Sequence, residues 1–167
     1  MAASLAVPLE TSLRVRDACL CLHTQRAARA LARRFDEALR PAVLTNGQFS
    51  LLMALNGPTP SPVGKLAGVL GADRTTLTAA LKPLARQGLV EIEADADNRR
   101  IRRIALTGEG HARLAAALPL WTQAHGALEA ELEGDDPARL RRDLRILSAH
   151  RSGAAVPAPS DSQEKPR

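Results

Sequence analysis

The stretch DRTTLTAALKPLARQG, residues 73–88, combines threonine hydroxyls with basic side chains near the start of a predicted helix. Short hydroxyl side chains at that position let the backbone approach base edges and phosphates, and a threonine methyl can contact thymine. The apolar residues of the stretch fall toward a core: Leu77, Ala80, Leu81 and Leu84. We therefore predict a DNA-contacting face, the alternative being that the threonines only cap the helix: Arg74, Thr75, Thr76, Thr78 and Lys82.

A second basic group lies in the segment ADADNRR, residues 94–100. The flanking segments LVEIE and IRRIAL alternate apolar and polar residues, which predicts two strands joined by a charged hairpin tip. Guanidinium groups suit a narrow minor groove with strong negative potential, so we expect Arg99 and Arg100 to contact one. For Arg102 and Arg103 we expect solvated side chains without such a role.

Helix signals precede the quoted stretch. Residues 12–40 carry apolar positions at helical spacing and predict one long helix that ends near Pro41. A helix of this length in a small chain usually packs against a partner subunit. Thr45 and Gln48 have the spacing of a capping box at the start of the next helix, and Gly57 is expected to stop it.

Two short helices are expected between that point and the strands. Ser61 is predicted to be an N-cap, with Pro62 as the first helical residue and Gly71 as the stop. Asp73 is the predicted N-cap of the helix that carries the threonines. Two helices joined by a tight turn and followed by a hairpin make a winged helix-turn-helix.

The remaining residues predict two further helices and a tail. Thr107 is expected to cap a helix that Pro119 kinks, and a break at residues 134–137 precedes the last helix. Leucines along these helices offer apolar area for a partner subunit: Leu114, Leu118, Leu128, Leu132, Leu140, Leu144 and Leu147. Residues 1–11 are expected to be flexible, and the Pro- and Ser-rich residues 151–167 disordered.

Composition agrees with a mainly α fold that has a small β-hairpin wing. Hydrophobic residues make up 45% of the 167 residues, but aromatic residues only 2%, and there is no Tyr. The core must therefore be aliphatic, and abundant Ala and Leu favour helix. A net charge of +5 and an isoelectric point near 10.2 raise the odds of a polyanionic partner, although charge alone also allows a basic domain without one.

Several function classes find no support in the sequence. No segment is long and apolar enough to span a membrane, and the first residues do not have the pattern of a secretory signal. Cys19 and Cys21 are one residue apart and cannot readily bridge without strain in a helix, so we expect a reducing cytoplasm. We expect no enzyme, cofactor or metal site, because no phosphate loop or nucleophile–base set stands out and the four histidines are scattered.

The span from Asp73 to Gly110 resembles the central region of MarR-family transcriptional regulators. The resemblance rests on the start Asp-Arg-Thr-Thr-Leu-Thr, the Lys-Pro-Leu and Gly-Leu-Val that follow, the charged wing, and Leu106-Thr107 with Gly110. Residues 12–150 fit the family order as one domain, with dimerisation helices in 12–40 and 107–150 around a winged helix-turn-helix in 41–106. The family commonly has Asp where this chain has Asn98; either Asp97 supplies that carboxylate or the wing is held differently.

The resemblance implies a homodimer on double-stranded DNA with a pseudo-palindromic operator. It also implies a repressor that a small ligand, such as an aromatic acid or a phenolic, releases from the operator by binding between the DNA-binding and dimerisation regions. Residue types and helical spacing suggest ligand-binding candidates, although residues of these types more often have core or surface roles: Cys19, His23, Arg26, Met53 and Trp121.

Two alternatives to a ligand-released repressor stay open. Some relatives sense peroxides through a cysteine on the first helix, so Cys19 or Cys21 could make this chain a thiol-based redox sensor. The tyrosine relay of those relatives cannot operate in a chain without Tyr. The other alternative is a winged-helix module for protein interaction, which basic residues on the recognition helix and wing do not favour.

Overall fold

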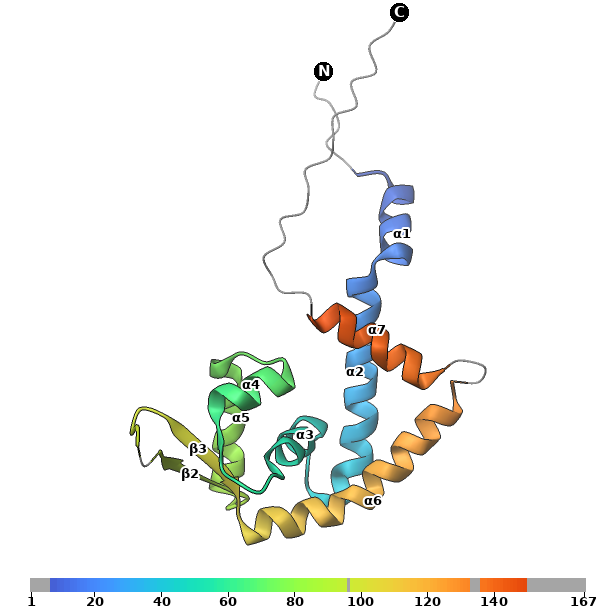
Figure 1. Ribbon diagram of the computed structural model, residues 1–167. Coiled ribbons are helices and arrows are strands. Elements are labelled where there is room, and N and C mark those ends of the chain that lie inside the picture. Colours follow the sequence, from blue (N-terminus) through green and yellow to red (C-terminus); the bar gives the residue numbers. More distant parts are fainter. Residues whose placement is uncertain (1–6, 96, 133–135, 150–167) are drawn as a thin grey trace, which may run out of the picture. The chain divides into compact units, whose positions relative to one another are not determined.

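The computed structural model describes residues 7–95, 97–132 and 136–149 (Figure 1). The chain divides into two compact units, Met1–Ala130 and Glu131–Arg167. The predicted single domain of residues 12–150 spans both units and stays a prediction, and the predicted disordered tail lies outside the described residues. Within these ranges no helix is at once long and apolar enough to cross a lipid bilayer.

The prediction of one long first helix is wrong, because the chain forms two helices, α1 (Leu9–Ala18) and α2 (Leu20–Leu39). Cys19 separates them with an extended backbone (φ −75°, ψ 100°), and its Sγ accepts a hydrogen bond from the Leu22 N–H at 3.4 Å. The thiol therefore caps α2. Helical spacing continues across this single residue, so the periodicity of the sequence does not reveal the break. α1 also begins within the segment expected to be flexible.

A short 3-10 turn, η1 (Arg40–Ala42), leads from α2 to α3 (Asn46–Leu55). The predicted capping box is confirmed: the Gln48 N–H donates to the Thr45 hydroxyl oxygen at 3.2 Å, and the Thr45 N–H donates to Gln48 Oε1 at 2.9 Å. The Asp36 carboxylate of α2 accepts a further bond from the Asn46 N–H at 2.6 Å. Side chains thus fix both the start of α3 and its connection to α2.

The two short helices are α4 (Val63–Leu70) and α5 (Arg74–Arg86). Gly71 ends α4 in the left-handed conformation (φ 62°), as predicted. The prediction for Ser61 and Pro62 is wrong: both form a strand, β1 (Ser61–Pro62), and Pro62 is the N-cap of α4. Ser61 pairs with Ile104 and Pro62 with Arg103, so a partner distant in the sequence determines their conformation.

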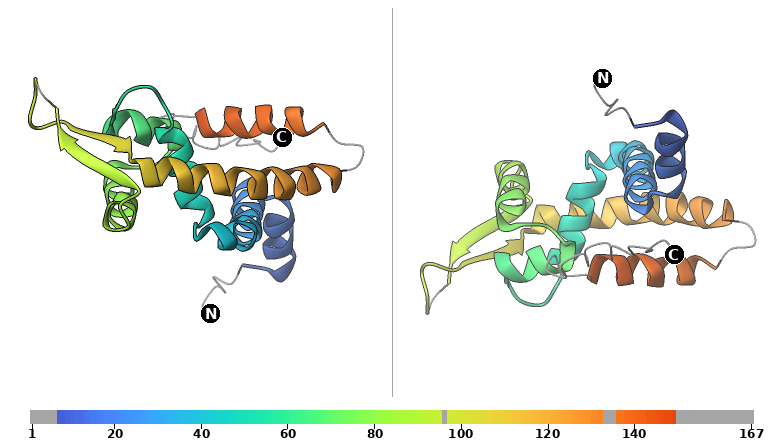
Figure 2. Two further views of the ribbon diagram at one scale, coloured as in Figure 1. Left: turned by 90° about the horizontal axis from the view of Figure 1, so that it is seen from below. Right: turned by 90° about the horizontal axis from the view of Figure 1, so that it is seen from above.

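The wing strands are β2 (Val90–Ala94) and β3 (Arg102–Leu106). Together with β1 they form an antiparallel sheet of order β1-β3-β2, one strand more than the predicted hairpin. Figure 2 shows that the β2–β3 hairpin projects beyond α4 and α5. The hairpin can therefore contact a molecule that binds along α5.

α6 (Gly108–Ala130) follows the sheet and continues through Pro119. The Thr107 hydroxyl accepts a bond from the Gly110 N–H at 3.0 Å, which confirms Thr107 as the cap, and donates to the Gly88 carbonyl oxygen at 2.6 Å. Gly110 lies so close to the strand that a β-carbon there would be 2.1 Å from the Leu89 carbonyl oxygen. One threonine and one glycine thus join α6 directly to the base of the wing.

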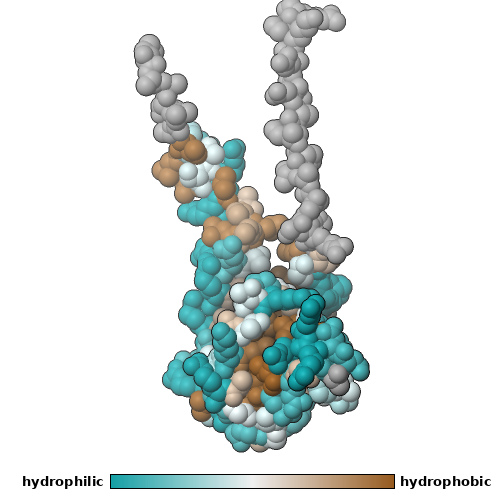
Figure 3. Space-filling view, turned by 90° about the vertical axis from the view of Figure 1, so that its left-hand side faces the viewer, coloured by the Kyte–Doolittle hydropathy of each residue, from teal (hydrophilic) through white to brown (hydrophobic). Residues whose placement is uncertain are grey.

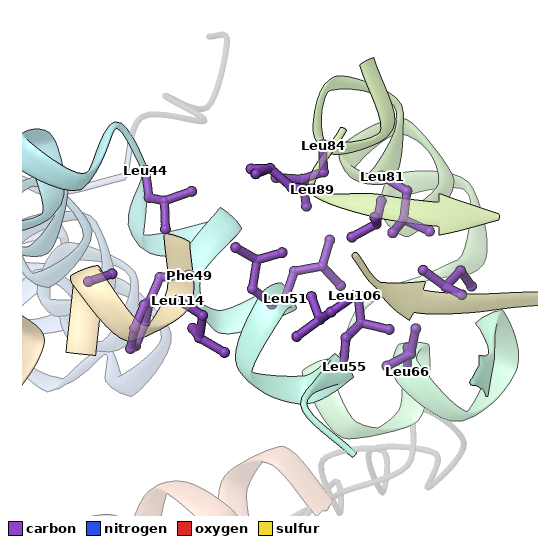
Figure 4. Close-up of a cluster of buried hydrophobic side chains, with 14 of the residues drawn as sticks. Leu44, Phe49, Leu51, Leu55, Leu66, Leu81, Leu84, Leu89, Leu106 and Leu114 are labelled. Carbon is purple, nitrogen blue, oxygen red and sulfur yellow. The ribbon is translucent and has the colours of Figure 1, made fainter. Parts of the chain in front are cut away.

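The core of the first unit is almost entirely aliphatic (Figure 4). Leucines from α2, α3, α4, α5, α6 and the sheet meet in it, and eight large side chains have almost no exposed surface: Leu39, Leu51, Leu52, Leu66, Leu81, Leu84, Leu89 and Ile104. Leu114, which we expected at a subunit interface, is only 5% exposed and belongs to this core. Leu118 is 44% exposed and stays available to a partner.

The second unit contains α7 (Pro137–Ala149), whose start is capped by the Asp136 carboxylate, 2.8 Å from the Ala138 nitrogen. No residue of α7 is buried within the chain. Its large apolar side chains are exposed by 43–64%: Leu140, Leu144, Ile146 and Leu147. α1 likewise buries no residue, and Figure 3 shows apolar side chains exposed along it.

Candidate nucleic-acid interface and apolar pocket

α5 divides into a buried apolar side and an exposed polar side. Leu77, Leu81 and Leu84 are at most 2% exposed and anchor the helix in the core. Ala80, predicted to join them, is exposed instead, because it lies one position away from the narrow buried stripe. All five predicted contact residues on this helix are exposed: Arg74, Thr75, Thr76, Thr78 and Lys82.

The three threonine hydroxyls of α5 are not equivalent. The Thr76 hydroxyl donates to Asp73 Oδ2 at 2.7 Å, and the Thr76 N–H donates to Asp73 Oδ1 at 2.8 Å. Asp73 is therefore the N-cap, as predicted, and the hydroxyl bond from Thr76 is the main reason that the pKa of Asp73 lies below its ordinary value. The Thr78 hydroxyl donates to the Arg74 carbonyl oxygen at 2.7 Å.

Thr75 is the threonine whose hydroxyl makes no hydrogen bond within the described ranges. A hydroxyl has one proton to donate. Phosphate oxygens and the acceptor atoms of the major groove form hydrogen bonds only with groups that donate a proton. Thr76 and Thr78 already donate within the helix, so in this conformation they can only accept. Part of the threonine set therefore does cap and brace the helix, and Thr75 retains a hydroxyl proton that it can donate to a bound molecule.

The turn of the wing hairpin is held by Asp95, which is 6% exposed. Its carboxylate accepts bonds from the backbone N–H groups of Asp97 (3.0 Å) and Asn98 (2.9 Å) and from the Arg103 guanidinium. The bond from Arg103 is the largest of the causes that lower the pKa of Asp95. Arg103 Nη1 also donates to the Pro60 carbonyl oxygen at 3.4 Å.

These contacts correct one expectation about the wing and decide between two alternatives for its carboxylate. Arg103 is not a merely solvated side chain, because it ties β3 to the wing turn and to the segment before β1. Asp97 is exposed and contributes its backbone N–H, so the carboxylate that orders the turn is that of Asp95. Asn98 completes the turn, since its side-chain oxygen accepts from the Arg100 N–H at 3.1 Å.

The structure brings the recognition helix and the wing together at one basic pocket of about 300 Å³. Arg74 from the start of α5 and Arg100 from the wing tip both line it. Lys65 and Arg102, which the sequence pattern did not indicate as contact residues, line it as well. Arg99 is exposed beside Arg100 on the tip. Figure 3, which faces the left-hand side of Figure 1, shows hydrophilic side chains framing this end of the first unit.

A second pocket, of about 410 Å³, lies among α3, α4 and α6 and is mainly apolar. It is lined by two of the five ligand-binding candidates, Met53 and Trp121, together with Phe49 and Leu118. The Trp121 ring stacks on His125 with centroids 4.6 Å apart. An apolar concavity with an aromatic wall and a nearby imidazole is suited to a flat, partly charged organic molecule.

The other three candidates lie elsewhere. Cys19 is the cap between α1 and α2, and His23 is exposed, with its Nε2 3.1 Å from the Asp17 carbonyl oxygen. Arg26 is exposed on α2. None of the three lines the apolar pocket among the described residues. Their shared helical spacing is local and carries no information about how α2 packs against α3 and α6.

A family model described as the MarR family matches residues 44–101. The regulator MosR of M. tuberculosis, solved in complex with DNA, is 44% identical over 78% of this chain and 93% of its own, with a TM-score of 0.72. A MarR variant from E. coli with operator DNA is 25% identical over 80% of this chain and 96% of its own, with a TM-score of 0.71.

CouR of Rhodococcus jostii RHA1, bound to p-coumaroyl-CoA, is 22% identical over 81% of this chain and 95% of its own, with a TM-score of 0.66. At that identity the likeness concerns the fold. Among curated proteins, none matches the sequence.

Proposed function

Because the chain belongs to the MarR family of DNA-binding transcriptional regulators, we propose that it is a homodimeric repressor that a small organic ligand releases from its operator. The observation that carries DNA binding is the exposed polar face of α5 beside the arginine-tipped wing. A helix with Thr75 at its start fits the major groove, and Arg99 at the wing tip fits the neighbouring minor groove. No catalytic step is part of this proposal, and the site of action is cytoplasmic DNA.

Dimer formation is supported by apolar side chains that the chain leaves uncovered. Leu13 on α1 is 40% exposed, Leu20 at the start of α2 is 68% exposed, and Leu118 on α6 is 44% exposed. Each of the two helices without a buried residue, α1 and α7, presents such side chains. A second copy would cover them and would double the number of base pairs read, with half-sites about one turn apart.

Ligand control is supported by the apolar pocket that Met53 and Trp121 line. α4, which contributes Val69 and Leu70 to this pocket, precedes α5 by a single turn at Gly71. A ligand that pushes α4 would therefore displace the recognition helix. The rings of Trp121 and Phe49 offer the pocket flat apolar surfaces for an aromatic ring, so an aromatic acid or a phenolic is the proposed class.

Footprinting on the DNA that flanks the chain's own gene tests the DNA-binding part. We expect a protected pseudo-palindrome and, for the double variant Arg99→Ala/Arg100→Ala, an affinity lower by about 1–3 kcal/mol for each specific base contact that the variant removes. Undiminished affinity of that variant in a gel-shift assay would remove the wing from the mechanism. Light scattering at micromolar concentration tests the dimer, and a monomer would contradict it.

A second candidate, thiol-based sensing, is favoured by the break at Cys19. Because Cys19 stands outside both helices and Cys21 is exposed in the first turn of α2, the two thiols are not held in one rigid helix. Hydrogen peroxide would oxidise a thiolate to a sulfenic acid as its O–O bond breaks and hydroxide leaves. Operator release by peroxide that is lost in Cys19→Ser or Cys21→Ser supports this candidate, whereas release only by aromatic acids supports the first.

A further inference from the structure

We propose that the basic pocket formed by Lys65, Arg74, Arg100 and Arg102 is a binding site for one backbone phosphate of the DNA. This inference rests on the proposed DNA binding and adds Lys65 and Arg102 to it. The pocket has a volume of about 300 Å³ and draws its walls from three elements: the first turn of α4, the first residue of α5, and the β3 side of the wing.

The positive charge of this pocket is uncompensated. None of these four side chains forms an ion pair with a carboxylate in the described part of the chain. The neighbouring Arg103, by contrast, is paired with the buried Asp95. Four like charges around one concavity repel one another, and an anion in the pocket would relieve that repulsion.

The start of α4 also favours an anion in the pocket. Val63, Gly64 and Lys65, which line the pocket, are its first three residues, and their N–H groups have no partner within the helix. Pro62 at the N-cap contributes no capping hydrogen bond. The positive end of a helix and unused backbone donors therefore add to the attraction of the four basic side chains for a phosphate.

The wing has two faces of opposite charge. Along β3, Arg102 lies on the same face as the buried Ile104, toward α4 and α5, and Arg103 lies on the opposite face. That opposite face bears the carboxylates of Glu91 and Glu93, which line a separate pocket with Asp95. The wing is thus cationic toward the recognition helix and anionic away from it, which orients its basic face toward the duplex.

Gly64 has a particular role in this arrangement. A β-carbon at Gly64 would lie 3.1 Å from Arg74 Nη2, so glycine lets the guanidinium rest against the first turn of α4. At Gly68 on the same helix a β-carbon would meet nothing within 4 Å. The pair Gly64→Ala and Gly68→Ala therefore separates an effect on the pocket from an effect on the helix.

The test measures binding of the full chain to a random-sequence duplex by fluorescence anisotropy over a series of salt concentrations. For Lys65→Ala and for Arg102→Ala we expect about tenfold weaker binding and a slope of log K against log salt that is shallower by about 0.9 for each phosphate that the variant no longer binds. Arg29→Ala, which removes an exposed charge from α2, should keep the wild-type slope. Gly64→Ala should melt at or above the wild-type temperature yet bind more weakly, and Gly68→Ala should lose no affinity.

The outcomes separate this inference from the proposed function. If the wild-type chain binds the duplex but Lys65→Ala and Arg102→Ala keep its affinity and slope, the phosphate site is wrong and DNA binding stands. If the wild-type chain binds no duplex at any salt concentration, both fall. A third outcome is that inorganic phosphate raises the melting temperature of the wild-type chain but not of Arg102→Ala, while both bind the duplex equally. That outcome would assign the pocket to a free anion and overturn its assignment to a DNA phosphate.

Discussion

The indole ring of Trp121 stacks on the ring of Phe49, with centroids 6.0 Å apart and ring planes 19° apart. Phe35 approaches the same indole at 6.4 Å, so every Phe and Trp of the chain belongs to one cluster. Phe49 and Trp121 also line the apolar pocket. Because the chain has a single Trp, its fluorescence reports on the surroundings of Trp121, which include this pocket.

We therefore expect aromatic carboxylic acids and phenols that enter the pocket to change the Trp121 emission in a saturable way. Met53→Glu places a carboxylate on a pocket wall whose side chain is 41% exposed, so folding should survive and affinity for an acid should fall by tenfold or more. The control Val43→Glu changes a 69% exposed residue that follows η1 and lies outside the pocket, and it should leave the titration unaltered. Equal affinities of the two variants would exclude the pocket as the binding site.

Local signals predicted the parts of the fold in which the partners lie within one helical turn. The Thr45–Gln48 capping box, the Asp73 cap and the Gly71 stop each depend on residues three or four positions apart, and all three are present. The strand at Ser61 and Pro62 was not predicted, because its pairing with β3 involves residues far along the chain. A strand of two residues is also too short to show the alternation of apolar and polar residues that predicts a strand.

The candidate site divides in the same way. Exposure of Thr75 and Lys82 follows from the spacing of Leu77, Leu81 and Leu84, which the sequence displays. The roles of Asp95 and Arg103 depend on how the wing turn folds back, and the sequence gives only their charges. Met53 and Trp121 line the same pocket because α3 packs against α6, which no local pattern encodes.

Thr75 and Thr78 should differ in their importance for DNA binding although both are exposed. Thr75→Val removes a hydroxyl that has its proton to donate, so we expect about fivefold weaker operator binding, the equivalent of about 1 kcal/mol. Thr78→Val removes a hydroxyl that already donates to the Arg74 carbonyl oxygen, and a smaller loss is expected. Gel-shift titrations of the two variants on the same operator decide the point; the reverse order would mean that Thr78 rotates its hydroxyl toward DNA.

The Asp95–Arg103 pair should make wing stability depend on pH. The pKa of Asp95 in the folded chain lies below its ordinary value of 3.8, so the unfolded chain takes up a proton more readily. Its stabilising contribution is therefore complete above about pH 5 and is lost as the pH falls through the folded pKa. Asp95→Asn should be less stable than wild type at pH 7 and should decline less steeply below about pH 4, as judged from urea midpoints over a pH series.

Asp97→Asn is the control for this prediction, since the Asp97 side chain is exposed and only its N–H reaches Asp95. Its pH profile should follow that of the wild-type chain. A wild-type profile for Asp95→Asn as well would show that Arg103 and the wing turn do not depend on the carboxylate.

Gly110 and Gly126 lie on the same helix, α6, and should respond in opposite ways to alanine. A β-carbon at Gly110 would be 2.1 Å from the Leu89 carbonyl oxygen and 3.1 Å from the Leu89 carbonyl carbon, which are backbone atoms that cannot rotate away. Gly110→Ala must therefore push α6 from the base of the wing, and we expect a loss of about 1–3 kcal/mol or more in the free energy of unfolding.

At Gly126 a β-carbon would meet nothing within 4 Å, so Gly126→Ala should gain about 0.5–1 kcal/mol from the lower backbone entropy of alanine in the unfolded chain. Urea denaturation of both variants at neutral pH measures the difference. The Thr107 hydroxyl links the Gly110 N–H to the Gly88 carbonyl oxygen at the base of the wing. A shift of α6 in Gly110→Ala should therefore also displace the wing from α5 and weaken DNA binding. A Gly110→Ala protein as stable as wild type would mean that α6 and the wing do not approach as closely as these distances require.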